Sequence, residues 1–351
     1  MFLSDTNSDF FKNKRVLVRI DCDVDLRPKN GRLVVDEDFR LRSVLPTIHF
    51  LEEVGAKGII LIGHLGRPGG KVVSELSLQP IADWFSQKLA TKVPLFSLRS
   101  SSFSTQNSII LLENLRFDSG EENNTPGFAR RLAALADIYV NDAFAVSHRR
   151  HASIVDLPKL LPSFLGLRFE AEVKTLSWIK KKAHRPIVFV LGGSKSGKLD
   201  YIPFLASWAD CLLVGGKLPL LIKSQKSKVK SQNYNAKVKI GHLRKNNRDI
   251  SATTIEQFKK IIAQAKTIIW AGPMGVYEEE ENQRGTLEIG QAIAGAEAFK
   301  LAGGGDTHRV LSWFNLWENF DFVSVGGGAM LQFLRDETLP GMGRAKIDNE
   351  D

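Results

Sequence analysis

The chain has 351 residues, a length that corresponds to about two average domains. Hydrophobic residues make up 43% and charged residues 25% of the chain, which excludes collagen-like, disordered and disulfide-scaffold proteins. The net charge of +9 is compatible with several kinds of anionic partner. The two cysteines, Cys22 and Cys211, are far apart and match no metal-binding spacing, so we expect reduced thiols and a cytoplasmic location.

Membrane and nucleic-acid binding are not expected from the sequence. The longest apolar runs, such as Gly58 to Ile62, are far shorter than the roughly 18 residues that a membrane-spanning helix needs. The start of the chain, Met1 to Phe11, lacks the basic and apolar regions of an export signal. The basic run Lys223 to Lys230 contains Ser and Gln but no aromatic residue, which favours a solvated loop over a surface that stacks on bases.

Short β-branched runs alternate with amphipathic segments along the chain, a pattern that predicts an α/β protein with parallel sheets. The expected strands are Val16 to Ile20, Gly58 to Ile62, Val93 to Phe96, Ile109 to Glu113, Ile138 to Asn141, Ile187 to Leu191, Leu212 to Val214, Thr267 to Trp270, Phe299 to Ala302 and Phe322 to Val325. Helical spacing occurs in Leu41 to Glu53, Leu78 to Leu89, Phe128 to Leu135, Thr254 to Ala265 and Gly285 to Ala294.

The longest helical candidate, Phe164 to Lys182, lies in the middle of the chain and ends in lysines followed by Pro186. A long helix between two α/β halves can serve as a connector, so we place a domain boundary near residue 180. The segment Ser224 to Asn247 is polar and is expected to be a loop with one short strand at Val238 to Ile240.

Four expected strands in the second half of the chain end in glycines. These ends are Gly192-Gly193, Gly215-Gly216, Gly303-Gly304-Gly305 and Gly326-Gly327-Gly328. Ligands of open parallel sheets lie at the carboxyl ends of strands, where glycine lets backbone N–H groups approach phosphate oxygens. One such turn is explained by the positive φ that glycine permits. Four in one half favour a nucleotide site.

Charged residues follow two of these glycine turns. Asp306 begins an expected helix, where a carboxylate either caps the helix or binds a magnesium ion that bridges phosphates. Lys195 and Lys198 follow Gly193, and their ammonium groups either neutralise a phosphoryl group or are solvated. The run from Gly192 to Leu199 nearly matches a P-loop, but Leu199 stands where the magnesium-binding hydroxyl belongs, so a P-loop is not expected.

The first half of the chain has basic residues at its expected strand ends instead. They are Arg40, His64, Arg67, Arg116, His148, Arg149 and His151. Each arginine alone fits a surface salt bridge, but a convergent set predicts a small substrate with several negative charges. His148 and His151 have the spacing of neighbours on a helix, yet without a third ligand they do not predict a metal site.

With these motifs in place, the sequence resembles the phosphoglycerate kinase family over most of its length. The resemblance is carried by VLVRIDCDVDL (Val16 to Leu26), DEDFRLRSVLPTI (Asp36 to Ile48), GHLGRPGGK (Gly63 to Lys71), LLENLRF (Leu111 to Phe117), IYVNDAFAVSHRRHAS (Ile138 to Ser153), LGGSK (Leu191 to Lys195), WAGPMGVYE (Trp270 to Glu278), GGGDT (Gly303 to Thr307) and GGGAMLQFL (Gly326 to Leu334). The motifs occur in the family's order, which makes the match specific.

The resemblance implies two Rossmann-like three-layer α/β/α domains with parallel sheets, joined by a long helix (about 164–182) across a hinged cleft. Residues 1–180 would form a phosphoglycerate-binding domain and residues 181–335 a nucleotide-binding domain. Residues 336–351 would return to the first domain. The family also implies a monomer that transfers a phosphoryl group between 1,3-bisphosphoglycerate and ADP, with Mg²⁺ as cofactor, to give 3-phosphoglycerate and ATP.

The family's functional residues carry over position by position. The substrate site would comprise Asp21, Asp23, Arg40, His64, Leu65, Gly66, Arg67, Arg116 and Arg149. The nucleotide site would comprise Gly192, Gly193, Lys195, Lys198, Gly215, Gly216, Glu278, Gly304, Gly305, Asp306 and Thr307. Arg40 and Lys195 would flank the transferred phosphoryl group, Glu278 would bind the ribose, and Asp306 would hold the metal.

The sequence departs from the family mainly in its second half. Ala271 and Lys217 stand where the family has Asn and Gly, and the segment between Val214 and Ile250 is tens of residues shorter. In the first half, Asp23 replaces an Asn. These departures would therefore weaken the affinity for ATP before the affinity for the phosphoglycerate substrate. The alternative function is that of a catalytically weak or silent anion-binding protein that resembles phosphoglycerate kinase.

Overall fold

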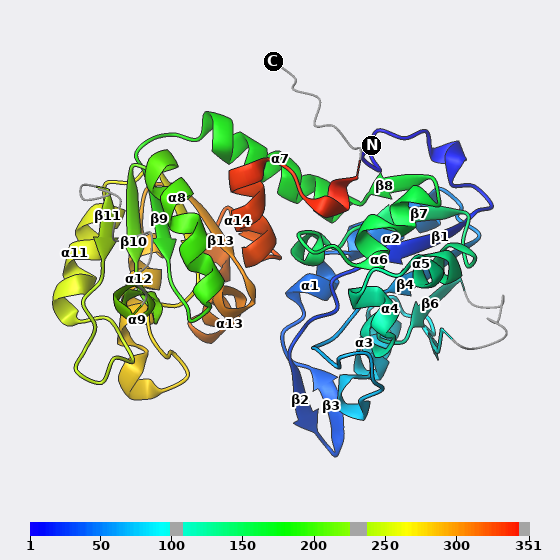
Figure 1. Cartoon of the computed structure of the whole chain (residues 1–351), viewed down its shortest axis with the longest axis horizontal. Coiled ribbons are helices and arrows are strands. Elements are labelled where there is room, and N and C mark those ends of the chain that lie inside the picture. Colours follow the sequence, from blue (N-terminus) through cyan, green and yellow to red (C-terminus); the bar gives the residue numbers. More distant parts are fainter. Residues whose placement is uncertain (99–107, 225–236, 344–351) are drawn as a thin grey trace. The chain divides into compact units, whose positions relative to one another are not determined.

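The protein divides into two compact units. Its structure, a computed structural model, describes residues 1–98, 108–224 and 237–343. Unit 1 comprises Met1–Lys174 and Thr338–Asp351, and unit 2 comprises Thr175–Glu337 (Figure 1). The chain therefore passes between the units twice, once within a helix and once after residue 337.

Unit 1 is built on a sheet of six parallel strands in the order β5-β6-β4-β1-β7-β8. The bounds are β1 Arg15–Arg19, β4 Gly58–Ile62, β5 Leu95–Phe96, β6 Ile109–Leu112, β7 Ile138–Asn141 and β8 Ser163–Leu165. The central strands are continuous apolar runs because both faces of a parallel sheet are covered. All five strands expected in this half are present.

Helices pack on both faces of the unit 1 sheet (Figure 1). The bounds are α1 Phe39–Arg42, α2 Leu45–Glu53, α3 Gln79–Lys88, α4 Ser119–Glu122, α5 Pro126–Ala133 and α6 Ala152–Val155. The apolar side chains of α2 and α3 form one core with β1 and β4, and those of α5 and α6 form a second core on the opposite face. This alternation gives three layers, as expected for an α/β/α unit.

A β-hairpin outside the sheet was not expected from the sequence. Strands β2 (Leu26–Lys29) and β3 (Arg32–Val35) pair antiparallel through a turn in which Asn30 and Gly31 have φ values of 50° and 75°. The Asn-Gly pair is a typical hairpin signal. It was hidden because β2 contains Pro28 and exposes most of its residues, so it shows no apolar alternation.

Unit 2 contains a second sheet of six parallel strands in the order β11-β10-β9-β12-β13-β14. The bounds are β9 Ile187–Leu191, β10 Cys211–Val214, β11 Val238–Ile240, β12 Thr267–Ala271, β13 Phe299–Gly303 and β14 Phe322–Ser324. The helices are α8 Ile202–Trp208, α9 Leu218–Ser224, α11 Ala252–Ile262, α12 Arg284–Ala294, α13 Gly305–Trp313 and α14 Gly327–Asp336. All strands expected here are present, including the short one at Val238–Ile240.

The long helix α7 spans Leu167–Lys182 and carries the chain from unit 1 into unit 2. The prediction that it begins at Phe164 is wrong, because Phe164 and Leu165 lie in β8 and pair with β7. The helix begins later because the Asp142 carboxylate accepts the Phe169 N–H at 2.9 Å, which caps the first turn. Such a cap comes from a distant part of the chain and leaves no local signal.

Residues 338–343 pack on unit 1. The N–H of Gly341 donates to the Ser147 carbonyl at 2.9 Å, and its own carbonyl accepts from the Asn141 side chain at 3.0 Å. Among the described residues, no helix is long and apolar enough to cross a membrane. Most of the basic run Lys223 to Lys230 lies outside the described residues.

We predict that Gly166→Ala destabilises the protein by about 1–3 kcal/mol, as overpacking of a buried site usually does. A Cβ atom at Gly166 would lie 2.4 Å from the carboxylate of Asp142 that caps α7. Gly127→Ala is the control, since a Cβ atom there meets nothing within 4 Å and alanine favours the helix α5. Urea denaturation measures both variants, and equal stabilities would contradict the packing described here.

Candidate functional site

In unit 1, the predicted substrate residues follow four neighbouring strands of the sheet. Asp21 follows β1, His64 follows β4, Arg116 follows β6 and Arg149 follows β7. Because the carboxyl ends of parallel strands share one edge, the structure brings these four positions together. Electrostatic interactions support this proximity, because the charges of Arg116 and Arg40 both lower the pKa of His64.

Arg19 is a buried member of this cluster that the sequence analysis missed. It is the last residue of β1 and is fully buried. Its guanidinium contacts the Nδ1 atom of His64 at 2.8 Å and donates to the Ser153 hydroxyl at 3.1 Å. An arginine inside an apolar strand was the available signal, because a charge is almost never buried without partners.

Arg116 is buried but only partly hydrogen-bonded. It lies in the short helix η3 (Leu115–Phe117), where its Nη1 donates to the Gly66 carbonyl at 2.6 Å. Its Nε lies 3.4 Å from a carboxylate oxygen of Glu122. Among the described residues, neither Nε nor Nη2 of Arg116 has a hydrogen-bond partner. Burial lowers the pKa of Arg116 to about 10, so the group remains a cation, and its Nη2 donor suits an anionic ligand.

Three histidines of the cluster are held neutral. Burial, followed by the charge of Arg149, lowers the pKa of His148 to about 4. Burial, followed by the charges of Arg116 and Arg149, lowers the pKa of His151 to about 3. Burial and the charge of Arg19 hold the pKa of His64 well below its usual value. The surrounding arginines therefore create a positive potential that favours a bound anion.

The two aspartates organise the loops of the site. Asp21 is buried and accepts the Ala145 N–H at 2.9 Å, and burial raises its pKa. Asp23 is exposed, and its carboxylate accepts the Gly66 N–H at 2.9 Å while its carbonyl accepts from the guanidinium of Arg40. The aspartate that departs from the family thus binds the His64 loop and orients Arg40.

The remaining predicted residues of unit 1 differ in exposure. Arg67 is exposed and Arg149 is partly exposed. Leu65 packs in the apolar core, and its carbonyl accepts from the Asn114 side chain at 2.8 Å. Gly66 has a φ of 64°, and a Cβ atom there would lie 2.8 Å from the side chain of Leu76, so this position requires glycine.

In unit 2, the glycine turns after β9, β10 and β12 pack directly on one another. A Cβ atom on Gly192 would lie 2.2 Å from the Pro273 carbonyl oxygen, and one on Gly216 would lie 2.5 Å from the Gly193 nitrogen. The N–H groups of the four predicted glycines all donate to carbonyls. The bonds are Gly192 to Ala271, Gly193 to Pro273, Gly215 to Leu191 and Gly216 to Met274, at 3.0, 2.7, 2.9 and 3.0 Å. The expectation that these amides face phosphate oxygens is therefore wrong for this structure; they hold the loops together instead.

Lys198 lies at the junction of these loops. Its ammonium donates to the carbonyls of Gly192 and Ala271 at 2.8 and 2.9 Å. Burial lowers the pKa of Lys198 to about 8, and the nearby Asp306 carboxylate opposes this shift. Lys195, three residues earlier, is exposed and also lowers the pKa of Lys198. The structure thus gathers two lysines and one carboxylate at this sheet edge.

The GGGDT motif forms the start of α13. Gly304 precedes the helix with a φ of 105°, a conformation that glycine adopts without strain. The hydroxyl of Thr307 accepts the Gly272 N–H at 2.9 Å and donates to the Gly303 carbonyl at 3.0 Å, so it ties β12 to β13. Asp306 is half-buried in the first turn, and Gly305 begins the helix. Glu278 is exposed in the loop after β12.

The described part of the chain forms no metal cluster by itself. Among the described residues, no group of three or more His, Cys, Asp or Glu side chains is arranged to hold a metal ion. Leu199, the residue that breaks the P-loop pattern, is buried in a 3₁₀ helix. A single carboxylate such as Asp306 fits Mg²⁺, which proteins usually bind through one or two carboxylates together with substrate phosphates.

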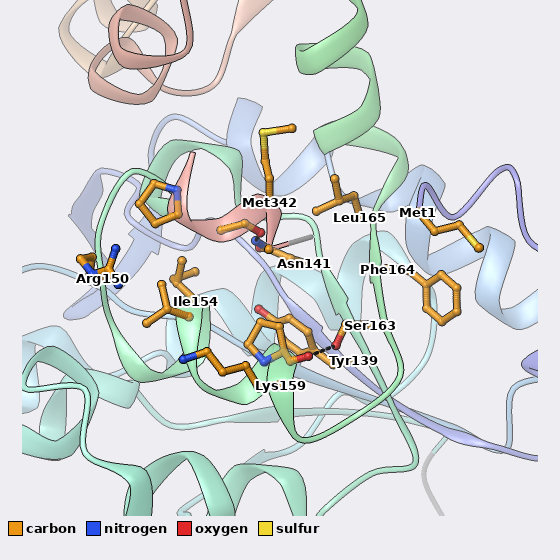
Figure 2. A pocket seen from close by; sticks show the side chains of 15 residues that line it. Met1, Tyr139, Asn141, Arg150, Ile154, Lys159, Ser163, Phe164, Leu165 and Met342 are labelled. Atoms are coloured by element: carbon orange, nitrogen blue, oxygen red, sulfur yellow. Dashed lines mark hydrogen bonds between the residues drawn. The ribbon is translucent and has the colours of Figure 1, made fainter. Parts of the chain in front are cut away.

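A separate cavity of about 790 Å³ lies in unit 1. Its walls come from β7, β8, α6 and residues 340–343, and Figure 2 shows Arg150 and Lys159 beside Ile154. None of the predicted substrate residues lines it. This cavity is therefore distinct from the arginine and histidine cluster.

Comparison with known proteins identifies the family. A family model described as phosphoglycerate kinase matches residues 5–246 and 222–337. The chain belongs to the phosphoglycerate kinase family. It is 36% identical to a phosphoglycerate kinase of Solibacter usitatus, with 94% of this chain and 96% of the relative covered. A phosphoglycerate kinase of Borreliella burgdorferi is 34% identical, with 96% and 98% covered.

Solved structures agree with this assignment. The phosphoglycerate kinase of Coxiella burnetii has a TM-score of 0.76 at 34% identity, with 97% of both chains covered. That of Pyrococcus horikoshii has a TM-score of 0.81 at 27% identity, with 97% of this chain and 98% of that chain covered. The fold of two parallel-sheet α/β domains is that of the family.

The two stretches matched by the phosphoglycerate kinase family model both include residues 222–246. The alignment with the Solibacter relative spans 378 positions but includes 94% of this 351-residue chain, or about 330 residues. About 48 of the 378 positions therefore have no residue in this chain. The family match breaks in the segment that the sequence analysis expects to be shortened.

We predict that the free energy of unfolding falls as the pH decreases below about 6.5, the pKa of an unfolded histidine. In the folded protein, the pKa values of His148 and His151 are about 4 and about 3. Between about pH 6.5 and these values, the unfolded chain binds more protons than the folded chain, so acid favours unfolding. Urea denaturation at pH 7.5, 6.5 and 5.5 measures the effect. His151→Gln should weaken the pH dependence and His49→Gln, which changes an exposed side chain, should not. An unchanged dependence in His151→Gln would refute the assignment.

Proposed function

We propose that the protein is a phosphoglycerate kinase that transfers a phosphoryl group reversibly between 1,3-bisphosphoglycerate and ADP, giving 3-phosphoglycerate and ATP. Family membership over nearly the whole chain supports this reaction. The observation that carries it is the buried Arg116 within a cluster of cations, because its Nε and Nη2 lack hydrogen-bond partners among the described residues. We also propose that the protein is cytoplasmic, from its two unpaired cysteines, and a monomer, from the family resemblance alone.

Unit 1 would bind the phosphoglycerate. Arg67, Arg116 and Arg149 would hold the phosphate that is not transferred, since arginine offers a planar fork of donors that matches phosphate oxygens. Arg40 would lie beside the carboxyl group that gains or loses the phosphoryl group. Asp21, Asp23, His64 and the Leu65-Gly66 backbone complete the site, either on the substrate or by holding the loops that carry its ligands.

Unit 2 would bind the nucleotide. Lys195, Lys198 and the N-terminus of α13 would attract the phosphates, because an ammonium group and the positive end of a helix dipole both favour anions. Glu278 would accept hydrogen bonds from the ribose. The glycines Gly192, Gly193, Gly215, Gly216, Gly304 and Gly305 would shape the surface against which the nucleotide lies. Asp306 would hold Mg²⁺, which neutralises phosphate charge when bound.

The reaction requires little acid-base chemistry from the protein. A carboxylate is already ionised at neutral pH, so it attacks or leaves phosphorus without a general base. Catalysis then rests on positioning and on neutralising charge, and we assign these roles at the transferred group to Arg40 and Lys195. We propose, from the family resemblance, that the two units close around both substrates, which would also exclude the water that hydrolyses acyl phosphates.

We predict that Lys195→Ala and Asp306→Ala each lower kcat/KM by at least about 100-fold, the usual cost of removing charge stabilisation of a transition state. A coupled assay of ATP consumption with 3-phosphoglycerate measures the loss. Lys260→Ala, which removes an exposed lysine on α11, is the control. If the parent protein were inactive and Mg-ADP at millimolar concentration did not raise its melting temperature, the silent anion-binding alternative would be favoured.

We predict that the affinity for Mg-ADP decreases as the pH rises from 7 to 9. The pKa of Lys198 is lowered by burial to about 8, so the lysine loses its proton in this range and its attraction for phosphate disappears. Calorimetric titration of Mg-ADP at pH 7, 8 and 9 measures the effect. Lys198→Met should remove most of the pH dependence, and an equally steep decrease in that variant would exclude Lys198 as its cause.

A further inference from the structure

A chain of buried hydrogen bonds connects His64 to an acidic residue behind the site. Arg19 contacts Nδ1 of His64 at 2.8 Å and donates from Nε to the Ser153 hydroxyl at 3.1 Å. That hydroxyl donates to Glu121 at 2.6 Å, and the Ser153 N–H donates to the other oxygen of the same carboxylate at 2.9 Å. The hydrogen-bond network therefore runs from His64 through Arg19 and Ser153 to Glu121.

The chemistry of these groups fixes the state of the His64 ring. An arginine side chain has donors only, so the Nδ1 atom that it contacts has to be an acceptor without a proton. The single proton of the neutral imidazole then lies on Nε2. Burial and the charges of Arg19, Arg116, His151 and Arg40 all favour the neutral ring. His64 thus presents Nε2 as a hydrogen-bond donor.

Glu121 provides the negative charge that makes this arrangement possible. It lies in α4 and is fully buried. The Nδ1 atom of His151 lies 3.9 Å from its Oε1 atom, the oxygen that accepts the Ser153 hydroxyl. Arg19 is fully buried as well, and a buried cation is stable only when it is paired and hydrogen-bonded. Ser153 bridges the two charges because its hydroxyl both accepts and donates.

We propose that Glu121 and Ser153 are positioning residues of the substrate site. They hold Arg19 against His64, and Arg19 in turn keeps the proton of His64 on Nε2, where it donates to the bound phosphoglycerate. Neither residue touches the substrate in this proposal. The inference rests on the proposed function for the identity of the ligand, but the state of His64 does not depend on it.

The first test observes the ring directly in the free protein. Nitrogen-15 NMR of the parent should show His64 with a protonated Nε2 and an unprotonated Nδ1 at pH 7. Glu121→Gln and Ser153→Ala should convert this to a mixture of both tautomers. Ser153→Thr keeps the hydroxyl and should retain the parent signals. Parent-like signals in both Glu121→Gln and Ser153→Ala would overturn the proposal.

The second test separates positioning from a general loss of stability. Glu121→Gln and Ser153→Ala should raise KM for 3-phosphoglycerate roughly tenfold, the scale of one lost hydrogen bond to a charged network, with KM for ATP unchanged. Glu75→Gln is the matched control, since Glu75 is exposed and its carboxylate accepts from the hydroxyl of the neighbouring Ser74. An unchanged KM for 3-phosphoglycerate in both variants would overturn the positioning role. If the parent itself bound no phosphoglycerate while the tautomer changed as expected, the proposed function would fail and the role of Glu121 toward His64 would stand.

Discussion

The arginine and histidine cluster of unit 1 depends on buried arginine donors that the protein hydrogen-bonds only in part. Arg19 and Arg116 are buried at the carboxyl edge of the sheet, with Arg149 close enough to lower the pKa of the neighbouring histidines. Glu121 and Glu122 offset part of this charge. Among the described residues, Nε of Arg116 reaches only the Glu122 carboxylate, at 3.4 Å, and Nη2 has no hydrogen-bond partner. A buried donor without a hydrogen-bond partner costs stability, and a bound anion would remove that cost.

In unit 2, the glycines serve the close packing of the loops that follow the strands. The turns after its strands approach one another so closely that no side chain fits, and the N–H groups of four glycines are used to hold the loops together. The charges for binding phosphate are therefore left to side chains, namely Lys195, Lys198 and Asp306. Lys198 is hydrogen-bonded to two carbonyls, so it is also part of the scaffold.

The sequence predicted the fold well because its strands are short, continuous apolar runs, several of them with glycines at their ends. All eleven expected strands are present, counting the short one at Val238–Ile240, and the alternation with helices placed the basic residues on one edge of the first sheet. The errors occurred where the chain depends on distant partners. Asp142 determines where α7 begins. The carbonyls of Pro273 and Met274 accept hydrogen bonds from the N–H groups of Gly193 and Gly216, so these amides do not face a ligand. Arg19 was missed because its partners, His64 and Ser153, are distant in sequence.

The most direct test of the account is the calorimetric binding of 3-phosphoglycerate to the parent and to Arg116→Met. The account predicts that the parent binds with at least about tenfold higher affinity, because each free donor of a buried arginine contributes a charge-assisted hydrogen bond. We also predict that, without ligand, Arg116→Met is at least as stable as the parent, because it removes a buried donor that lacks a hydrogen-bond partner and leaves the partly exposed Glu122 unpaired. Equal affinities, or a variant that is far less stable without ligand, would show that Arg116 serves the fold and not the substrate.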